Sequence, residues 1–207
     1  MPIDAFSNEI QHLANRHSRL VLTADPGAGK STRVPFILKC PSGKTLIAQP
    51  RRLAATSLAH FLSSQRGEQV GQSIGYRVRF DSRLSTNTWL EFVTDGLLVK
   101  LILEDPELTG ISTVILDEFH ERTQFFDFAL ALLLEIQAVF RPDLRVIVMS
   151  ATLNADQLSE YMCAPHIHIP AKVYSNQIEH VESSVHLGTT VPLVAEAILR
   201  MINDVES

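Results

Sequence analysis

The stretch Ala24-Asp25-Pro26-Gly27-Ala28-Gly29-Lys30-Ser31-Thr32 lies between a short hydrophobic run, residues 19–24, and a segment of helical character, residues 30–38. Glycines let the backbone turn its amides inward around phosphate oxygens, and a following helix adds the positive end of its dipole. Lys30 supplies a cation for the outer phosphates and Ser31 a hydroxyl for a magnesium ion. The stretch therefore predicts a phosphate-binding loop, which consists of Gly27, Ala28, Gly29, Lys30, Ser31 and Thr32.

The stretch departs from the common pattern at its first position, because Ala24 stands where the first glycine is usual. A small residue is expected to suffice there. A chance match is the alternative, since Gly-Lys-Ser alone is frequent, and the strand-loop-helix context argues against it.

A second motif, Asp117-Glu118, directly follows the hydrophobic run Val114-Ile115-Leu116. Two carboxylates at the end of a buried strand repel each other unless a cation lies between them. We therefore expect Asp117 to hold magnesium through water, and Glu118 to orient and deprotonate an attacking water. The predicted metal ligands are Ser31, Asp117 and Glu118. Taken alone, the acidic pair could also decorate a helix N-terminus.

Strand and helix patterns alternate along the chain. Strands are predicted at residues 19–24, 45–49, 73–78, 88–93, 113–117 and 145–150, and helices at residues 5–16, 30–38, 53–65, 96–104, 124–139 and 155–162. After Pro170 the pattern loosens into a strand at 178–185 and a helix at 191–202. This alternation predicts an α/β fold, a mostly parallel sheet with helices on both faces. Ligands of such sheets gather at the carboxyl ends of the strands, where both motifs fall.

Composition and charge set further limits. The 207 residues are 45% hydrophobic and carry a formal net charge of −5, which fits one compact domain and argues against a generic polyanion binder. The charge is uneven, because residues 49–83 hold six arginines against two acidic residues, whereas residues 84–207 hold six basic against eighteen acidic residues. The basic segment is either a contact surface for an anion or a set of solvated loops and helix faces.

Neither the cysteines nor the first residues point to an extracellular or membrane protein. Cys40 and Cys163 are far apart and have no partner at metal-ligand spacing. Met1-Pro2-Ile3-Asp4 lacks a basic segment followed by an apolar core, and no apolar run approaches the roughly 18 residues of a spanning helix. We expect a cytoplasmic monomer with no membrane contact.

Several blocks resemble, in the same order, the motifs of the DEAH/RHA group of superfamily 2 helicases. Asp117-Glu118-Phe119-His120-Glu121-Arg122 resembles motif II, with phenylalanine in the alanine position. The other blocks are Gln49-Pro50-Arg51-Arg52-Leu53-Ala54-Ala55 (motif Ia), Ile74-Gly75-Tyr76-Arg77-Val78-Arg79-Phe80 (hook turn), Thr94-Asp95-Gly96-Leu97-Leu98 (motif Ib) and Ser150-Ala151-Thr152 (motif III). The resemblance implies a RecA-like P-loop NTPase domain and points toward the bacterial HrpB helicases of this group.

The resemblance also implies residue roles in ATP hydrolysis with Mg²⁺. Lys30, Asp117, Glu118 and His120 would form the catalytic set, with His120 coupling the site to a partner lobe. Ser150 and Thr152 would link hydrolysis to strand separation through hydrogen bonds to the carboxylates of motif II. As alternatives, His120 is a capping or surface histidine, and motif III is an ordinary turn after a strand.

By the same resemblance, RNA would be held by its sugar-phosphate backbone. The residues implied are Arg51, Arg52, Arg79, Phe80 and Thr94. Arginine and hydroxyl contacts to the backbone hold a strand without reading its sequence, and they weaken as salt rises. Arg79 and Phe80 could instead be an ordinary edge-strand pair.

Two departures from the group carry consequences. Phe61 stands where an adenine-stacking arginine is usual, so we expect it to contact the base of ATP or ADP with loose base selectivity. No Gln-x-x-Gly-Arg-x-x-Arg block is present, and arginine fingers contribute about 10³ to 10⁵ in rate. We therefore expect residues 1–171 to form the first RecA-like domain and residues 172–207 a linker and the start of a truncated second lobe, so that the chain binds nucleotide but hydrolyses it slowly.

The sequence thus predicts the nucleotide-binding lobe of an ATP-dependent DEAH-type RNA helicase, with DNA open as a second polymer. Two other classes share some of these features: a P-loop ATPase or kinase without a nucleic-acid role, and a non-catalytic nucleotide-binding module. A flavivirus-type helicase lobe shares Pro26-Gly27-Ala28-Gly29-Lys30, but the Gln-Pro-Arg-Arg block favours the bacterial group.

Overall fold

The computed structural model describes residues 1–41, 43–151, 155–170, 194–195 and 198. The chain divides into two units, Met1–Val173 and Tyr174–Ser207, and the architecture below is that of the first. The predicted linker and truncated lobe, together with the predicted strand at 178–185 and helix at 191–202, lie outside the described residues except for positions 194, 195 and 198.

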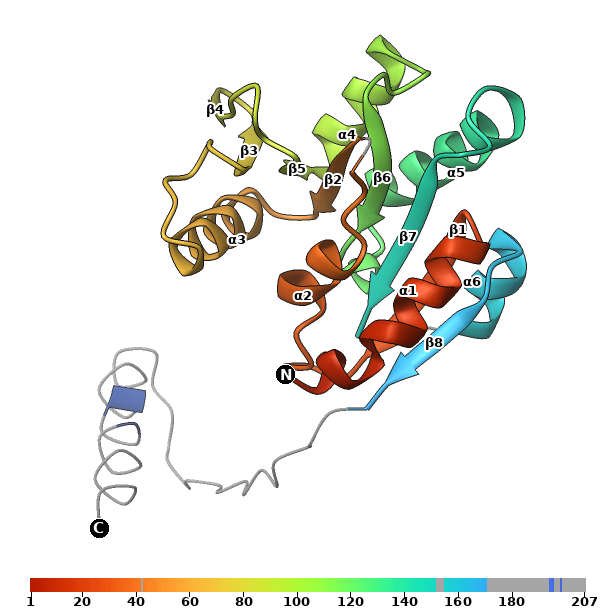
Figure 1. The fold of residues 1–207 in the computed structure, drawn as a ribbon, viewed down its shortest axis with the longest axis horizontal. Coiled ribbons are helices and arrows are strands. Elements are labelled where there is room, and N and C mark those ends of the chain that lie inside the picture. The colour runs from red at the N-terminus through yellow and green to blue at the C-terminus, as the bar shows by residue number, and fades with distance from the viewer. Residues whose placement is uncertain (42, 152–154, 171–193, 196–197, 199–207) are drawn as a thin grey trace, which may run out of the picture. The chain divides into compact units, whose positions relative to one another are not determined.

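An eight-stranded sheet forms the centre of the first unit, in the order β4-β3-β5-β2-β6-β7-β1-β8 (Figure 1). The strands are β1 (Arg19–Ala24), β2 (Lys44–Gln49), β3 (Ile74–Val78), β4 (Asp81–Arg83), β5 (Leu90–Thr94), β6 (Ile111–Leu116), β7 (Arg145–Ser150) and β8 (His166–Ile169). Neighbours run parallel except for β3 and β4, which form an antiparallel hairpin. The predicted α/β class with a mostly parallel sheet is confirmed.

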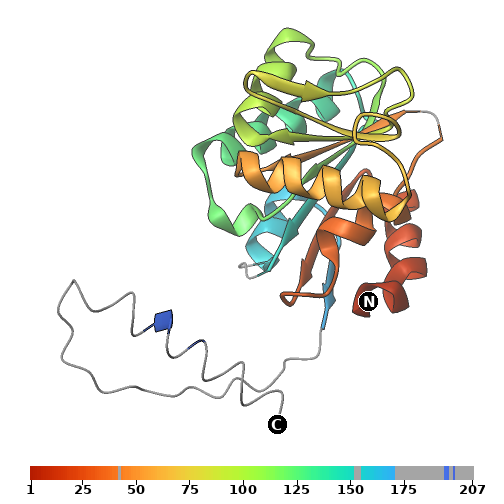
Figure 2. The same cartoon turned by 90° about the vertical axis from the view of Figure 1, so that its left-hand side faces the viewer.

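Helices cover both faces of the sheet. One layer contains α1 (Ser7–Arg16), α2 (Lys30–Ile37) and α3 (Arg52–Gln65), and the other contains α4 (Asp95–Glu104), α5 (Gln124–Val139) and α6 (Ala155–Met162). Two short 3₁₀ helices, η1 (Pro2–Phe6) and η2 (Phe119–Glu121), complete the fold. In Figure 2, which is turned by 90° from Figure 1, α3 is the orange helix in front of the strands.

Side-chain alternation along the strands explains the two layers. Leu20 and Leu22 of β1 pack into the core beneath α1, α2 and α3, whereas Val21 packs into the core beneath α4, α5 and α6. Successive strand residues point to opposite faces, so a strand covered on both sides must be apolar throughout. This requirement produces the uninterrupted hydrophobic runs seen in the sequence.

Within residues 1–170, the six predicted strands and six predicted helices are present, with ends displaced by at most two residues, and the predicted start of the first helix lies in η1. The strands β4 and β8 were missed. β4 has three residues and is largely exposed, and β8 alternates exposed histidines with buried isoleucines over only four residues. Such short edge strands carry too little periodicity to be read from one sequence.

The sheet order divides its carboxyl edge into two halves. Motif II and the phosphate-binding loop follow β6 and β1, on either side of β7, whereas motif Ia, motif Ib and the hook turn follow β2, β5 and β3. The arrowheads of β2, β6 and β7 in Figure 1 mark this edge. The two sets of candidate residues therefore lie beside one another along one edge.

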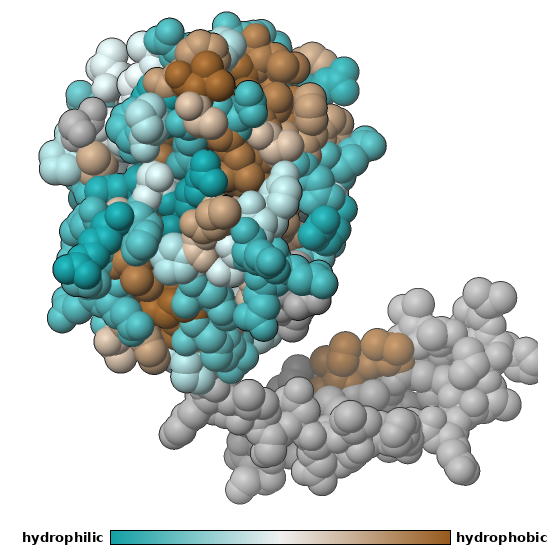
Figure 3. Space-filling model, turned by 90° about the vertical axis from the view of Figure 1, so that its right-hand side faces the viewer, coloured by the Kyte–Doolittle hydropathy of each residue, from teal (hydrophilic) through white to brown (hydrophobic). Residues whose placement is uncertain are grey.

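On the face shown in Figure 3, hydrophobic side chains gather mainly toward the top, and hydrophilic side chains cover most of the rest. On α5 the exposed apolar residues include Phe125 and Phe128. Within the described part of the chain, no helix combines the length and apolar character needed to cross a membrane.

Candidate nucleotide site and nucleic-acid surface

The phosphate-binding loop turns at two glycines. Gly27 has φ of 81° and Gly29 has φ of 97°, in the left-handed region that glycine adopts without steric penalty. Gly29 is the N-cap of α2, so the unpaired amides of the first helical turn face the loop. A Cβ atom at Gly29 would lie 2.6 Å from Met1 Sδ, and any larger residue would displace Met1.

Lys30 lies across this loop. Its side chain is buried, and Nζ donates a hydrogen bond of 2.7 Å to the carbonyl oxygen of Ala24, the last residue of β1. Ala24 is itself fully buried in the core beneath α1, α2 and α3. Alanine in place of the usual glycine is therefore accommodated by packing, while its carbonyl still holds the lysine.

Asp117 lies at the end of β6 and is fully buried. Gln49 Nε2 donates to its Oδ2 at 2.6 Å, and the amide of Glu118 donates to its Oδ1 at 2.9 Å. Burial raises the pKa of Asp117 to about 6, against the hydrogen bond from the Ser31 hydroxyl and with a further contribution from the Glu118 charge. A divalent cation would offset this cost, and a hydroxyl beside a carboxylate is the donor set that Mg²⁺ uses together with phosphate oxygens. The predicted ligands Ser31 and Asp117 are thus in direct contact, and the residues present fit a magnesium ion.

Glu118 and His120 extend the site toward motif III. Glu118 has φ of 56°, which turns the chain sharply after β6. Its Oε2 lies 3.4 Å from His120 Nε2, and the amide of Ala151 donates to His120 Nδ1 at 3.4 Å. His120 therefore lies between Glu118 of motif II and Ala151, which follows β7, and its coupling role stays a prediction. Thr152 lies outside the described residues, so its predicted bond to the carboxylates stays a prediction, as does that of the buried Ser150.

A pocket of about 520 Å³ joins these parts. Its lining residues are Met1, Pro26, Gly27, Gly29, Lys30, Ser31, Thr32, Leu58, Phe61, Glu118, His120 and Ala151. Phe61, 44% exposed, and Leu58 come from α3 and line the same pocket as the polar loop. Apolar side chains and phosphate-binding amides in one pocket match a nucleotide, which combines an apolar base face with charged phosphates.

Five residues of this site were not among the predicted ones: Met1, Pro26, Gln49, Leu58 and Ala151. Gln49 had a sequence signal, since it is a polar residue that ends a hydrophobic strand. Its partner could not be read from the sequence, because β2 and β6 become neighbours only through the sheet order, in which Ala48 pairs with Leu116. Leu58 and Met1 carry no motif, and their place follows only from the packing of α3 and η1.

The predicted RNA residues gather along the other half of the edge. Arg51 follows β2 and lies 3.2 Å from Glu121 Oε2 of motif II, and Arg52 lies 3.9 Å from Asp81 Oδ2 of β4. Exposed pairs of this kind contribute only about 0 to 1 kcal/mol, so both guanidinium groups can exchange their partner for phosphate. Thr94 ends β5 and is the N-cap residue of α4, although its side chain makes no capping hydrogen bond.

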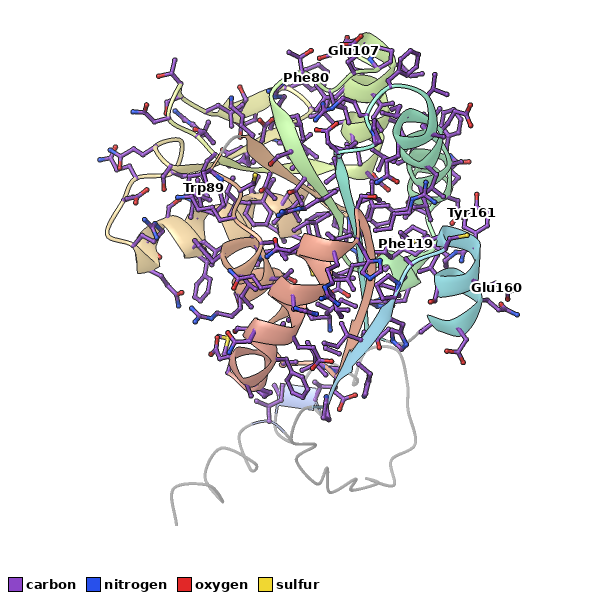
Figure 4. The ribbon with its side chains drawn as sticks, turned by 45° about the vertical axis from the view of Figure 1, so that its right-hand side comes forward. Phe80, Trp89, Glu107, Phe119, Glu160 and Tyr161 are labelled. Carbon is purple, nitrogen blue, oxygen red and sulfur yellow. The ribbon has the colours of Figure 1, made fainter. Side chains whose placement is uncertain are left out.

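Arg79 and Phe80 form the two-residue loop between β3 and β4. The edge-strand alternative for them is therefore wrong, because both residues lie outside the strands. Phe80 is 89% exposed, and the Arg79 guanidinium lies 4.8 Å from the centre of its ring. Figure 4 shows Phe80 well separated from Phe119 of motif II.

A glycine loop that caps a helix, a buried lysine across it and a carboxylate bonded to the loop hydroxyl, all at the carboxyl edge of a parallel sheet, define a RecA-like P-loop NTPase domain. The chain belongs to the DEAD/DEAH box helicase family, whose model matches residues 7–161.

Individual relatives agree with this assignment. The chain is 43% identical over 165 residues to the ATP-dependent RNA helicase HrpB of Escherichia coli K12, covering 78% of this chain and 20% of that protein. It is 39% identical over 179 residues to the DExH-box ATP-dependent RNA helicase DExH1 of Arabidopsis thaliana, covering 82% and 18%. The crystal structure of the E. coli DEAH/RHA helicase HrpB superposes with a TM-score of 0.85 at 37% identity, covering 97% of this chain and 26% of that one. The chain thus spans about a fifth to a quarter of the length of these relatives.

Proposed function

We propose that this chain is the nucleotide-binding lobe of an ATP-dependent DEAH-type RNA helicase and that it takes part in coupling ATP hydrolysis to movement along RNA. The observation that carries the proposal is the contact between Ser31 of the phosphate-binding loop and the buried Asp117 of motif II, beside a pocket that Ser31 and Glu118 line. Neither a scaffold nor a degenerate domain requires that contact.

Each residue of the pocket has a part in the proposed reaction. Gly27, Gly29 and the start of α2 bind phosphate oxygens through backbone amides, and Lys30 exchanges the Ala24 carbonyl for the outer phosphates. Ser31 and Asp117, with Glu118 nearby, would hold a magnesium ion, which supplies charge neutralisation on the phosphates. Glu118 orients the attacking water and accepts its proton, and His120 relays the state of the site to motif III.

The proposed polymer is RNA, held through Arg51, Arg52, Arg79, Phe80 and Thr94. The pair between Arg51 and Glu121 supports coupling, because it joins this surface to motif II. A P-loop ATPase or kinase without a nucleic-acid role would have no use for such a link. DNA would fit the same backbone contacts, since they do not depend on sequence.

The rest of the proposal concerns the whole protein. We infer that residues 1–171 form the first RecA-like domain, that residues 172–207 lead into a second lobe, and that arginines of this lobe complete the site. The protein would then act as a cytoplasmic monomer, and the present chain alone would turn over slowly.

The test is the Glu118→Gln variant of the full-length protein. Removing the proposed base while keeping the shape of the side chain should preserve nucleotide affinity and abolish RNA-stimulated ATP hydrolysis. Glu160→Gln, an exposed change on α6, is the matched control and should hydrolyse ATP like the wild type. RNA-stimulated turnover retained in Glu118→Gln would overturn the assignment.

Nucleotide binding is tested with the present chain by titration with ADP and Mg²⁺. Lys30→Ala should weaken ADP binding about tenfold or more, because a hydrogen bond to a charged group contributes roughly 1.5 to 3 kcal/mol. Lys100→Ala, an exposed lysine of α4, should bind ADP normally. Equal affinity in Lys30→Ala and Lys100→Ala would exclude the proposed phosphate loop.

A further inference from the structure

A further pocket, of about 370 Å³, lies at the amino end of β1, whereas the nucleotide site lies at the carboxyl end of the same strand. Its lining includes Arg16 at the end of α1, Arg19 at the start of β1, Gln137 of α5, and Cys163, which follows α6. The length of β1, at about 3.3 Å per residue, separates this pocket from the phosphate-binding loop. The pocket is therefore a separate site.

The pocket is lined by basic side chains and by no acidic one among the described residues. The basic residues are Arg16, His17 and Arg19. Within the described part of the chain, none of the three forms an ion pair with a carboxylate. The whole chain carries a formal net charge of −5, so a pocket of this composition is a local departure that attracts anions.

Arg19 is held in place by neutral groups only. Its Nε donates to Gln137 Oε1 at 2.7 Å, and its Nη1 donates to the carbonyl oxygen of Met162 at 3.0 Å. The side chain is half-buried. A guanidinium has five N–H donors, so three remain without a described partner. A partly desolvated cation that lacks a carboxylate partner costs free energy, and a bound anion would offset that cost.

Gln137 fixes the orientation of this guanidinium. It is buried, and the other buried residues of α5 are all apolar. Its Nε2 donates to the carbonyl oxygens of Leu144 at 2.6 Å and of Ser18 at 3.1 Å. Because the amide nitrogen is bonded on this side, Oε1 must face Arg19. The guanidinium is therefore positioned before any ligand binds, which lowers the entropic cost of binding.

We propose that this pocket binds a small phosphorylated compound, with a phosphate group on the Arg19 guanidinium and with Arg16 and His17 near the remaining charge. A planar guanidinium offers paired donors that match phosphate oxygens. The pocket volume leaves room for a second phosphate or a small organic group. The pocket lies at the opposite end of the strands from the proposed RNA surface, which favours a free compound over an RNA strand. The proposal goes beyond the function proposed above and does not depend on it.

The test uses the thiol of Cys163, which is exposed and lines the pocket, to report occupancy. The present chain is alkylated with iodoacetamide while inorganic pyrophosphate is titrated without Mg²⁺, and the modified cysteines are identified by peptide mass spectrometry. Pyrophosphate should slow the alkylation of Cys163 in a saturable way and leave that of Cys40 unchanged. Sodium chloride at the same ionic strength should protect neither thiol.

Variants connect this protection to the basic side chains. Arg19→Gln should raise the pyrophosphate concentration for half-protection about tenfold or more, because charge-assisted hydrogen bonds are lost. Arg16→Ala should raise it as well, and Arg16 is exposed and makes no side-chain hydrogen bond to the described residues, so its loss leaves the packing intact. Arg66→Gln, an exposed change after α3, is the matched control and should behave like the wild type. Lys30→Ala should also be protected like the wild type, because the phosphate-binding loop is a different site.

The outcomes separate this proposal from the proposed function. Absence of protection in the wild type, or equal half-protection in the wild type, Arg19→Gln and Arg16→Ala, would overturn the phosphate pocket and leave the helicase assignment standing. Protection that disappears in Lys30→Ala would assign the effect to the phosphate-binding loop and would also overturn the pocket. A 5′-phosphorylated oligouridine that protects Cys163 at lower concentration than pyrophosphate, when its 5′-hydroxyl form does not, would assign the pocket to an RNA end and overturn the free compound.

Discussion

Gln49 Nε2 lies 2.6 Å from Asp117 Oδ2, so an amide that ends β2 holds the carboxylate that follows β6. Both side chains are buried. Asp117 also accepts hydrogen bonds from the Ser31 hydroxyl and the Glu118 amide, which come from the phosphate-binding loop and from motif II itself. Three donors from three parts of the chain therefore orient the proposed metal carboxylate before a nucleotide binds.

This arrangement predicts that Gln49→Met weakens magnesium binding without removing any proposed ligand. Partners that orient a metal ligand typically contribute about 10-fold to 100-fold in metal affinity. The Mg²⁺ concentration that half-saturates ADP binding, measured by calorimetry, should rise by a factor in that range.

Thr45→Val is the control for Gln49, because Thr45 lies on the same strand, is buried, and has a hydroxyl with no hydrogen-bond partner in the described structure. It should leave the Mg²⁺ dependence unchanged. A Gln49→Met variant with the magnesium dependence of the wild type would contradict the role of the amide.

Because Phe61 lines the nucleotide pocket, we expect the site to discriminate only weakly among nucleobases. An aromatic ring stacks on any base, whereas hydrogen bonds to its edge would be needed to select adenine. The present chain should bind ADP and GDP with affinities within a few-fold of each other, and Phe61→Ala should weaken both about 5-fold or more. Phe128→Ala, a similarly exposed change on α5, is the control. A Phe61→Ala variant that loses affinity for ADP alone would show that Phe61 selects the base.

The sequence predicts the residues at the nucleotide half of the sheet's carboxyl edge better than the contacts between them. The phosphate loop and motif II could be predicted because their chemistry lies in contiguous residues: Gly29, Lys30 and Ser31 form one turn, and Asp117 and Glu118 are adjacent. The strands that carry them were identified from uninterrupted apolar runs. Their meeting at one edge follows from parallel packing alone.

The contacts between these parts required the structure. Gln49 reaches Asp117 only because β2 is inserted beside β6, and the 207-residue sequence contains no local signal for that strand order. The same holds for Leu58 and Met1, which line the pocket through helix packing. The positive φ of Phe80 was also not predicted, because β4, with three largely exposed residues, has neither the length nor the periodicity that identifies a strand, so the turn before it could not be located.

We expect Glu91 of β5, which lies outside the nucleotide site, to make the free energy of unfolding depend on pH. It is buried, and its Oε1 lies 2.8 Å from Arg77 Nε. Burial raises the pKa of Glu91 above its ordinary value of 4.5, although Arg77 and Lys44 oppose the shift. A carboxyl with a raised pKa in the folded state binds its proton more tightly there than in the unfolded chain, so its contribution to the free energy of unfolding falls as pH rises from about 4.5 through the folded pKa.

Glu91→Gln should therefore flatten the pH dependence of the free energy of unfolding above pH 4.5, measured by urea denaturation. Glu104→Gln, an exposed change on α4, should reproduce the wild-type profile. A Glu91→Gln profile with the wild-type slope across this window would mean that the carboxyl titrates normally in the folded protein.

We expect Arg51 to contribute measurably to the dependence of RNA affinity on salt concentration. Its side chain is 74% exposed and its only ion pair in the described structure is with Glu121, so it can turn to a phosphate at low cost. Each phosphate neutralised on a single strand contributes about 0.7 to the slope of log affinity against log salt, so Arg51→Ala should lower that slope by about this amount.

Glu121→Gln should instead tighten RNA binding, because it releases Arg51 from its partner. Arg16→Ala, at the end of α1 and outside the proposed RNA surface, should change neither affinity nor slope. If Arg51→Ala and Arg16→Ala gave the same slope as the wild type, the phosphate contact would have to be assigned to other residues of the basic segment.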